Sequence, residues 1–104
     1  MTTYVLSYHG EGEMPDTPEG QAEVMAAWNA WFAELGDAVV DGGNPYGDSR
    51  TVASDGSITP GNAAKLSGYS VVQAGDLDAA AALAKGCPIL GAGGSITVSE
   101  VIEM

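Results

Sequence analysis

Residues 68–88 (GYSVVQAGDLDAAAALAKGCP) limit the possible folds more than any other part of the chain. Residues 69–73 are rich in the aromatic and β-branched side chains that strands favour. Asp76 can accept a hydrogen bond from the first turn of a helix, and residues 79–84 are the most helix-favouring run. Pro88 prevents that helix from continuing. The stretch therefore predicts a strand, a turn and a helix, in that order.

An earlier helix is predicted by capping residues and by apolar spacing. Thr17 precedes Pro18, a pair typical of a helix N-terminus, and Gly36 suits the C-terminus of the same helix. Within residues 21–35 the large apolar side chains recur at spacings of three and four. They are Val24, Met25, Trp28, Trp31, Phe32 and Leu35. This spacing predicts one wide apolar face that buries both tryptophans.

Three further segments have strand patterns. Residues 3–9 alternate in polarity, residues 37–41 form a short β-prone run, and residues 96–102 alternate again. An Asp-Gly pair in the middle of residues 51–59 predicts a hairpin. The order is β-α-β, hairpin, β-α-β. It is typical of an α+β, ferredoxin-like fold, in which two helices cover one face of an antiparallel sheet.

The predicted sheet carries apolar side chains on both faces. Val5 alternates with Tyr4 and Leu6, and Val72 and Val98 add to the apolar set. Because one layer of helices covers only one face, we expect a second copy of the chain to cover the other. The sequence therefore predicts a homodimer through the sheet face.

Length and charge limit the domain organisation and the classes of partner. The 104 residues predict a single domain over residues 1–104. A net charge of −11 leaves little positive charge to neutralise phosphates, so we expect neither nucleic acid nor a membrane surface as a partner. A single cysteine, no basic leader and no apolar run of about 20 residues indicate a cytoplasmic protein.

His9 and Asp41 are the candidate catalytic residues. His9 is the only side chain whose ordinary titration lies near neutral pH. Asp41, on the predicted second strand, could approach and orient the imidazole. This pairing predicts a cofactor-independent lyase or isomerase with His9 as general acid or base. The alternative is a structural histidine at a strand end, which faces solvent or bonds to the backbone.

The predicted first helix also indicates a cavity. Its aromatic side chains are bulkier than a sheet of valines and small residues can interdigitate, which favours an apolar hollow with a polar edge. We expect Tyr8, Trp28 and Tyr69 to line this hollow, with Asn44 as a polar contact. The alternative is that the tryptophans are ordinary core residues.

Cys87 is a further candidate ligand contact, and we expect it to be a buried, unreactive thiol. It follows the C-terminus of the predicted second helix, whose partial negative charge disfavours a thiolate. No Cys or His spacing suits a metal, and the glycine-rich residues 91–95 follow a helix instead of opening one. The sequence therefore predicts neither a metal nor a cofactor.

Several short segments stand out together by their order and spacing: Tyr4–Tyr8, Trp28–Gly36, Gly42–Pro45, Gly68–Val72, Leu77–Ala80, Cys87–Pro88 and Ile96–Val98. Taken together, they resemble the YCII-related family, in particular its DGPF branch. The resemblance implies a dimeric α+β barrel, in which two ferredoxin-like units pack sheet against sheet. It also implies a small cavity in each protomer or at the seam.

The chain departs from the pattern of that family at its suggested acid–base pair. Many members carry a His on the first helix and an Asp before the proline that follows the last helix. Here Met25 and Trp28 stand near the expected His, and Cys87 precedes Pro88. Residues 60–62 stand where the Asp-Gly-Pro-Phe motif is expected. The resemblance therefore implies a YCII-related protein of unassigned activity that binds a small polar or aromatic molecule; the enzyme and a purely structural dimer are the alternatives.

Overall fold

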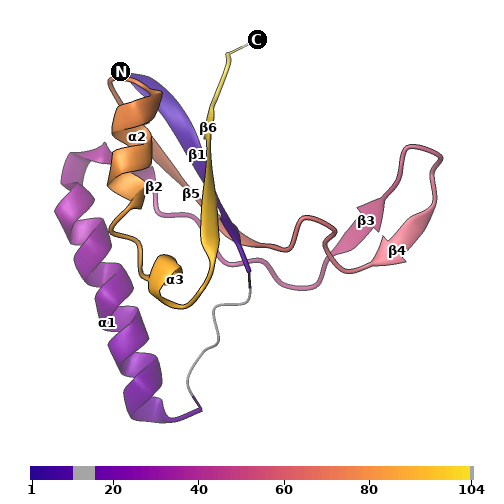
Figure 1. The fold of residues 1–104 in the computed structure, drawn as a ribbon, viewed down its shortest axis with the longest axis horizontal. Helices are drawn as coiled ribbons and strands as arrows, with labels where there is room; N and C mark the ends of the chain where they lie inside the picture. Colours follow the sequence, from indigo (N-terminus) through magenta and orange to yellow (C-terminus); the bar gives the residue numbers. More distant parts are fainter. Residues whose placement is uncertain (11–15, 104) are drawn as a thin grey trace.

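A four-stranded sheet forms the centre of the computed structural model, which describes residues 1–10 and 16–103 (Figure 1). Its strands are β1 (Thr2–His9), β2 (Val39–Asp41), β5 (Leu66–Ala74) and β6 (Ser95–Glu100), in the spatial order β2-β5-β1-β6. Every neighbouring pair is antiparallel. The α+β class and the antiparallel sheet are therefore confirmed, and the strand order is compatible with the predicted ferredoxin-like arrangement.

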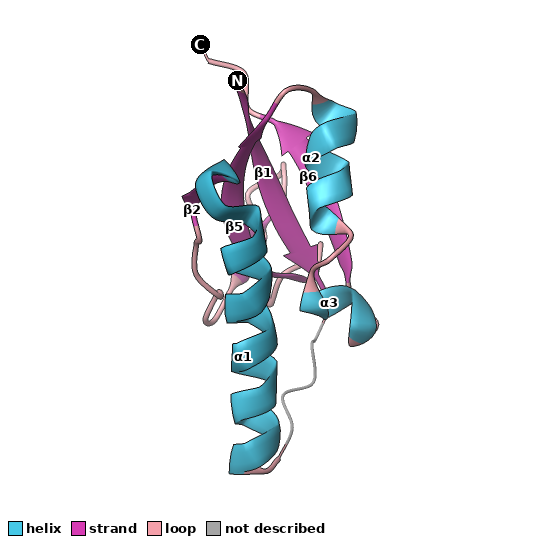
Figure 2. Ribbon diagram, turned by 90° about the vertical axis from the view of Figure 1, so that its left-hand side faces the viewer, coloured by secondary structure: helices cyan, strands magenta, loops and turns pink. Residues whose placement is uncertain are grey.

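The α-helices lie on one face of this sheet (Figure 2). The helical elements are α1 (Pro18–Leu35), the 3-10 helix η1 (Gly36–Ala38), α2 (Leu77–Ala84) and α3 (Pro88–Gly91). The sequence pattern does not predict α3, because four residues are too few to display a helical period. None of the helices in the described part of the chain is long and apolar enough to span a bilayer.

Both predicted N-terminal helix caps are confirmed. Thr17 Oγ1 accepts a hydrogen bond from the Gly20 amide at 3.1 Å, and Pro18 opens α1. Asp76 Oδ1 accepts from the Ala79 amide at 2.8 Å at the start of α2. Each cap satisfies an amide that the helix itself leaves without a partner.

The core lies between the sheet and the helices. Tyr4, Leu6 and Tyr8 of β1 point to this side together with Ser70 and Val72 of β5, and all five are buried. The residues between them point to the opposite face and are partly exposed. This alternation is the two-residue period of a strand that is covered on one side only.

One of the two tryptophans of α1 is buried in this core. Trp31 is 3% exposed, and its Nε1 donates to the Leu83 carbonyl of α2 at 3.1 Å. Trp28 is only partly buried, and Met25 is 53% exposed. The N-terminal half of α1 extends past the end of the sheet (Figure 2). The prediction that α1 buries both tryptophans is therefore wrong for Trp28, because the helix is longer than the surface that could cover it.

The predicted hairpin is confirmed as a separate two-stranded sheet. It consists of β3 (Arg50–Val52) and β4 (Ile58–Pro60), and it extends away from the central sheet (Figure 1). Asp55 Oδ1 accepts from the Ser57 amide at 2.9 Å, and Gly56 adopts a φ of +88° that suits glycine in the turn.

The chain after β2 runs close beside β5. The Tyr46 amide donates to the Ser67 carbonyl at 2.9 Å, and the Tyr69 amide donates to the Asn44 carbonyl at 3.3 Å. Gly43 makes the closest approach: its φ is +75°, and a Cβ there would overlap the Tyr69 carbonyl oxygen. Glycine is therefore required at this position both for its backbone conformation and for space.

Gly43→Ala should destabilise the protein by about 3 kcal/mol or more. The new Cβ would clash with the Tyr69 backbone, and alanine is strained in the left-handed conformation of this position. Gly42→Ala is the matched control, since Gly42 has no positive φ and a Cβ added to it would meet no heavy atom within 4 Å. We expect it to change stability by less than about 1 kcal/mol. Urea unfolding followed by tryptophan fluorescence measures both. Equal stabilities of the two variants would contradict the close approach.

Candidate functional site

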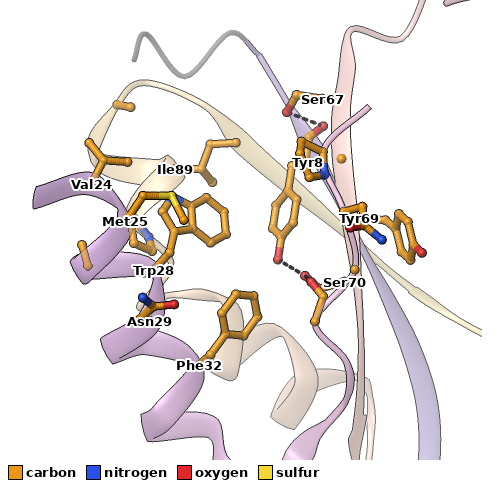
Figure 3. A pocket seen from close by; sticks show the side chains of 18 of the residues that line it. Tyr8, Val24, Met25, Trp28, Asn29, Phe32, Ser67, Tyr69, Ser70 and Ile89 are labelled. Atoms are coloured by element: carbon orange, nitrogen blue, oxygen red, sulfur yellow. Dashed lines mark hydrogen bonds between the residues drawn. The ribbon is translucent and has the colours of Figure 1, made fainter. Parts of the chain in front are cut away.

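A cavity of about 650 Å³ lies between α1, α3 and the adjoining end of the sheet (Figure 3). α1 contributes one wall, the chain from Gly42 to Pro45 and the facing part of β5 contribute another, and Tyr8 of β1 lies between them. The overhang of α1 beyond the sheet creates this space, because helix and strands are no longer in direct contact there. Its volume suits a small organic molecule.

Apolar side chains of α1 form the first wall. Val24, Met25, Trp28 and Phe32 all line the cavity. The Trp28 ring meets the Tyr8 ring edge to face, with centroids 5.3 Å apart at 85°, and lies 6.0 Å from the Phe32 ring. Such contacts hold aromatic rings in defined orientations. The wall therefore presents fixed aromatic surface for a flat ligand to pack against.

A chain of hydrogen bonds closes the opposite side of the cavity. Tyr8 Oη donates to Ser70 Oγ at 2.7 Å, and Ser70 Oγ donates to the Gly42 carbonyl at 2.7 Å. Figure 3 shows the Tyr8 ring between Trp28 and Ser70, with its hydroxyl directed at Ser70. Ser70 is fully buried, so these two bonds satisfy a hydroxyl that has no access to water.

Burial keeps two ionisable groups beside the cavity in their neutral forms. Loss of solvation raises the pKa of Tyr8 to about 12; the bond to Ser70 opposes this rise and the Cys87 thiol adds to it. Loss of solvation likewise raises the pKa of Cys87 to about 11, against a smaller opposing effect of the Ile89 amide. Both groups are neutral near pH 7 already at their ordinary pKa values, and burial extends the neutral range of Tyr8 and Cys87 well into alkaline pH.

The structure brings four of the predicted ligand contacts to this cavity. Tyr8, Trp28, Asn44 and Tyr69 all line it. The Tyr69 ring, however, stacks on Tyr46 with centroids 6.0 Å apart at 24°, and Figure 3 shows it directed away from Trp28. Tyr69 neighbours the inward-facing Ser70, so the strand period turns its ring to the opposite face. It borders the cavity without offering its ring as a wall.

Cys87 lies behind the cavity instead of in its surface. The residue is 3% exposed, and the next two residues, Pro88 and Ile89, line the cavity in its place. Its position and its raised pKa are those of an unreactive thiol.

His9 and Asp41 are not brought together. Nδ1 of His9 lies 2.9 Å from the Ala64 carbonyl and therefore donates to it, and Nε2 lies 2.8 Å from Thr97 Oγ1. Asp41 Oδ1 accepts from the Gly43 amide at 2.8 Å. β5 separates the two strands, and the β5 partners of His9 and Asp41 are five residues apart, roughly 16 Å along the strand. An acid–base role of His9 stays a prediction without its proposed partner.

Sequence reasoning missed the most buried polar residue of the site. Ser70 stands two residues from Val72, in a strand whose inward positions are otherwise apolar or glycine. A hydroxyl at an inward position needs hydrogen-bond partners, and this requirement could have identified Ser70 from the sequence. Its actual partners, Tyr8 and Gly42, are 62 and 28 residues away in the chain, so no local pattern names them.

The described residues contain no group of three or more His, Cys, Asp or Glu side chains that could hold a metal ion.

Among known protein families, the model of the YCII-related domain matches residues 1–104 of the chain. The chain belongs to the YCII-related family. No curated protein and no solved structure gives a significant match.

The raised pKa values predict that the protein loses stability at alkaline pH. The unfolded chain releases the Cys87 and Tyr8 protons near their ordinary pKa values of 9.0 and 10.0, whereas the folded chain retains them to about 11 and 12. The stabilisation is therefore complete below about pH 9 and is lost as the pH rises through 11 to 12. Each group lowers the free energy of unfolding by at most about 1.4 kcal/mol per pH unit. Urea unfolding at pH 7 to 11 measures the loss.

Cys87→Ala separates the two groups. Between pH 9 and 11 the free energy of unfolding of the variant should fall by less than that of the wild type. The variant lacks the thiol, which begins to titrate at a lower pH than the Tyr8 phenol. Identical pH dependence of the two proteins would mean that Cys87 is not held neutral by burial.

Proposed function

We propose that this YCII-related protein binds a small aromatic molecule in the cavity beneath α1. One observation carries the proposal: a cavity of about 650 Å³ combines an aromatic wall with a polar side, where a hydrogen bond joins Tyr8 to the buried Ser70. Mostly apolar cavities with a few fixed polar groups are typical of small-molecule sites. Trp28 is the central contact, because it reaches both Tyr8 and Phe32.

The chemistry of the cavity favours binding over catalysis. Tyr8 and Cys87 are held neutral, and among the described residues that line the cavity Glu23 is the only carboxylate. General acid–base catalysis needs a group whose protonation changes near the working pH, with a partner that orients it. The lining offers no such pair within the described residues, and His9 lies outside it.

Binding can be tested by calorimetric titration with indole, benzofuran and naphthalene. Fragments of this size should bind with dissociation constants between about 10 μM and 1 mM. Trp28→Ala should weaken binding about tenfold or more, because it removes the central wall. Tyr46→Ala is the control, since Tyr46 lies outside the cavity lining. Absence of binding by all three fragments, or equal affinities of wild type and Trp28→Ala, would contradict the proposal.

We also propose that the protein is a homodimer through the sheet face that its own helices leave uncovered. Val5 and Val71 are paired on that face, and the stacked Tyr46 and Tyr69 rings add apolar area beside them. Burial of such a surface favours association, and a stable interface of this type buries on the order of 2,000 Å². The resemblance to dimeric α+β barrels supports the same arrangement.

Light scattering at micromolar concentration should give twice the chain mass. Val5→Asp should shift the protein towards the monomer, because it places a charge in the centre of the proposed interface. Val52→Asp on the exposed hairpin is the control and should leave the mass unchanged, since Val52 is 66% exposed and lies off the sheet. A monomeric wild type would overturn the proposal.

A further inference from the structure

The hydrogen-bond chain on the polar side of the cavity has a fixed direction. The Gly42 carbonyl can only accept, so the hydroxyl proton of Ser70 must point to it. Ser70 Oγ can then only accept from Tyr8, which uses the single proton of Tyr8 Oη. Tyr8 therefore keeps only lone pairs for any further partner.

The hydroxyl of Ser67 also donates its proton to a backbone carbonyl. Its Oγ lies 3.3 Å from the Tyr8 carbonyl and donates to it, so this hydroxyl also retains only acceptor capacity. Ser67 and Ser70 are both among the residues that line the cavity. Tyr8 and Ser67 thus direct their hydroxyl protons to protein acceptors and leave lone pairs for a ligand, whereas the buried Ser70 oxygen is satisfied by its two protein partners.

The charge of the cavity lining also limits which ligands can bind. Glu23 lies at the cavity, and none of the Lys and Arg residues of the chain lines it. The chain as a whole carries a net charge of −11. An anionic ligand would meet a negative field and no positive partner, so uncharged and cationic molecules are favoured.

We infer, on the basis of the binding function proposed above, that the ligand is an uncharged or cationic aromatic molecule that donates an N–H or O–H group to Tyr8 Oη. The aromatic part packs against Trp28 and Phe32, and the donor satisfies the free lone pair of Tyr8. A ligand with only acceptor atoms at that position would face acceptors alone, and both partners would lose a hydrogen bond to water without replacement.

Indole and benzofuran test this inference because they share one shape and differ at one atom. Indole presents an N–H donor where benzofuran presents a ring oxygen. Calorimetric titration of the wild type should give about tenfold tighter binding for indole, the size of one net hydrogen bond. Indole-3-carboxylate keeps the N–H and adds a negative charge, and it should bind more weakly than indole.

Three variants locate the effect. Tyr8→Phe removes the acceptor and should bring indole to within about twofold of benzofuran while benzofuran affinity is retained. Ser70→Ala frees the Tyr8 proton to point into the cavity, which should also reduce the preference for indole over benzofuran. Tyr46→Phe removes a hydroxyl outside the lining and should keep the full preference. Thermal unfolding of each variant verifies that it is folded.

The outcomes separate this inference from the binding function on which it rests. Binding of both fragments with equal affinity, or tighter binding of benzofuran, overturns the donor requirement and leaves a cavity that binds aromatics. Tighter binding of indole-3-carboxylate than of indole overturns the charge requirement. Failure of both neutral fragments to bind overturns the binding function and the inference together. The wild-type comparison decides the donor requirement even if a variant does not fold.

Discussion

The antiparallel pairing of β1 with β5 is the constraint on which the rest of the structure depends. Leu6 lies opposite Ser70, and Tyr8 lies opposite Gly68, so one continuous set of side chains faces the helices. A shift of β1 by a single residue would turn Tyr8 to the other face and bring His9 to the helices, while Ser70 of β5 stayed in place. The register therefore determines which residues form the core and which hydroxyls meet at the cavity.

The cavity follows from a difference in length between two elements. α1 contains 18 residues, which is about 27 Å, and only its C-terminal part packs over the sheet. Trp31 lies in the packed part and Trp28 at its limit, so two residues of one type on one helix face have different roles. α3 closes the space from the other side, since Ile89 lines the cavity. A single helix thus supplies both core and binding wall.

Local sequence signals predicted what depends on local contacts. Thr17, Asp76 and the turn at Gly56 were identified correctly, because caps and tight turns involve residues close in the chain. Local patterns alone could not show that β5 lies between His9 and Asp41, because strand order is set by contacts distant in the chain. Four lining residues were predicted, yet neither the direction of the Tyr69 ring nor the partners of Ser70 could be derived without the register.

The hairpin of β3 and β4 is a two-stranded sheet of its own, separate from the central sheet. Its two stems are joined where the Gly61 amide donates to the Ser49 carbonyl at 2.9 Å, and Thr51 Oγ1 donates to the Gly61 carbonyl at 3.0 Å. The chain thus leaves and rejoins the domain at nearly one point. Lengthening, trimming or labelling this arm would leave the sheet register untouched, so residues 53–57 offer a place to attach a probe or a surface tether without disturbing the cavity.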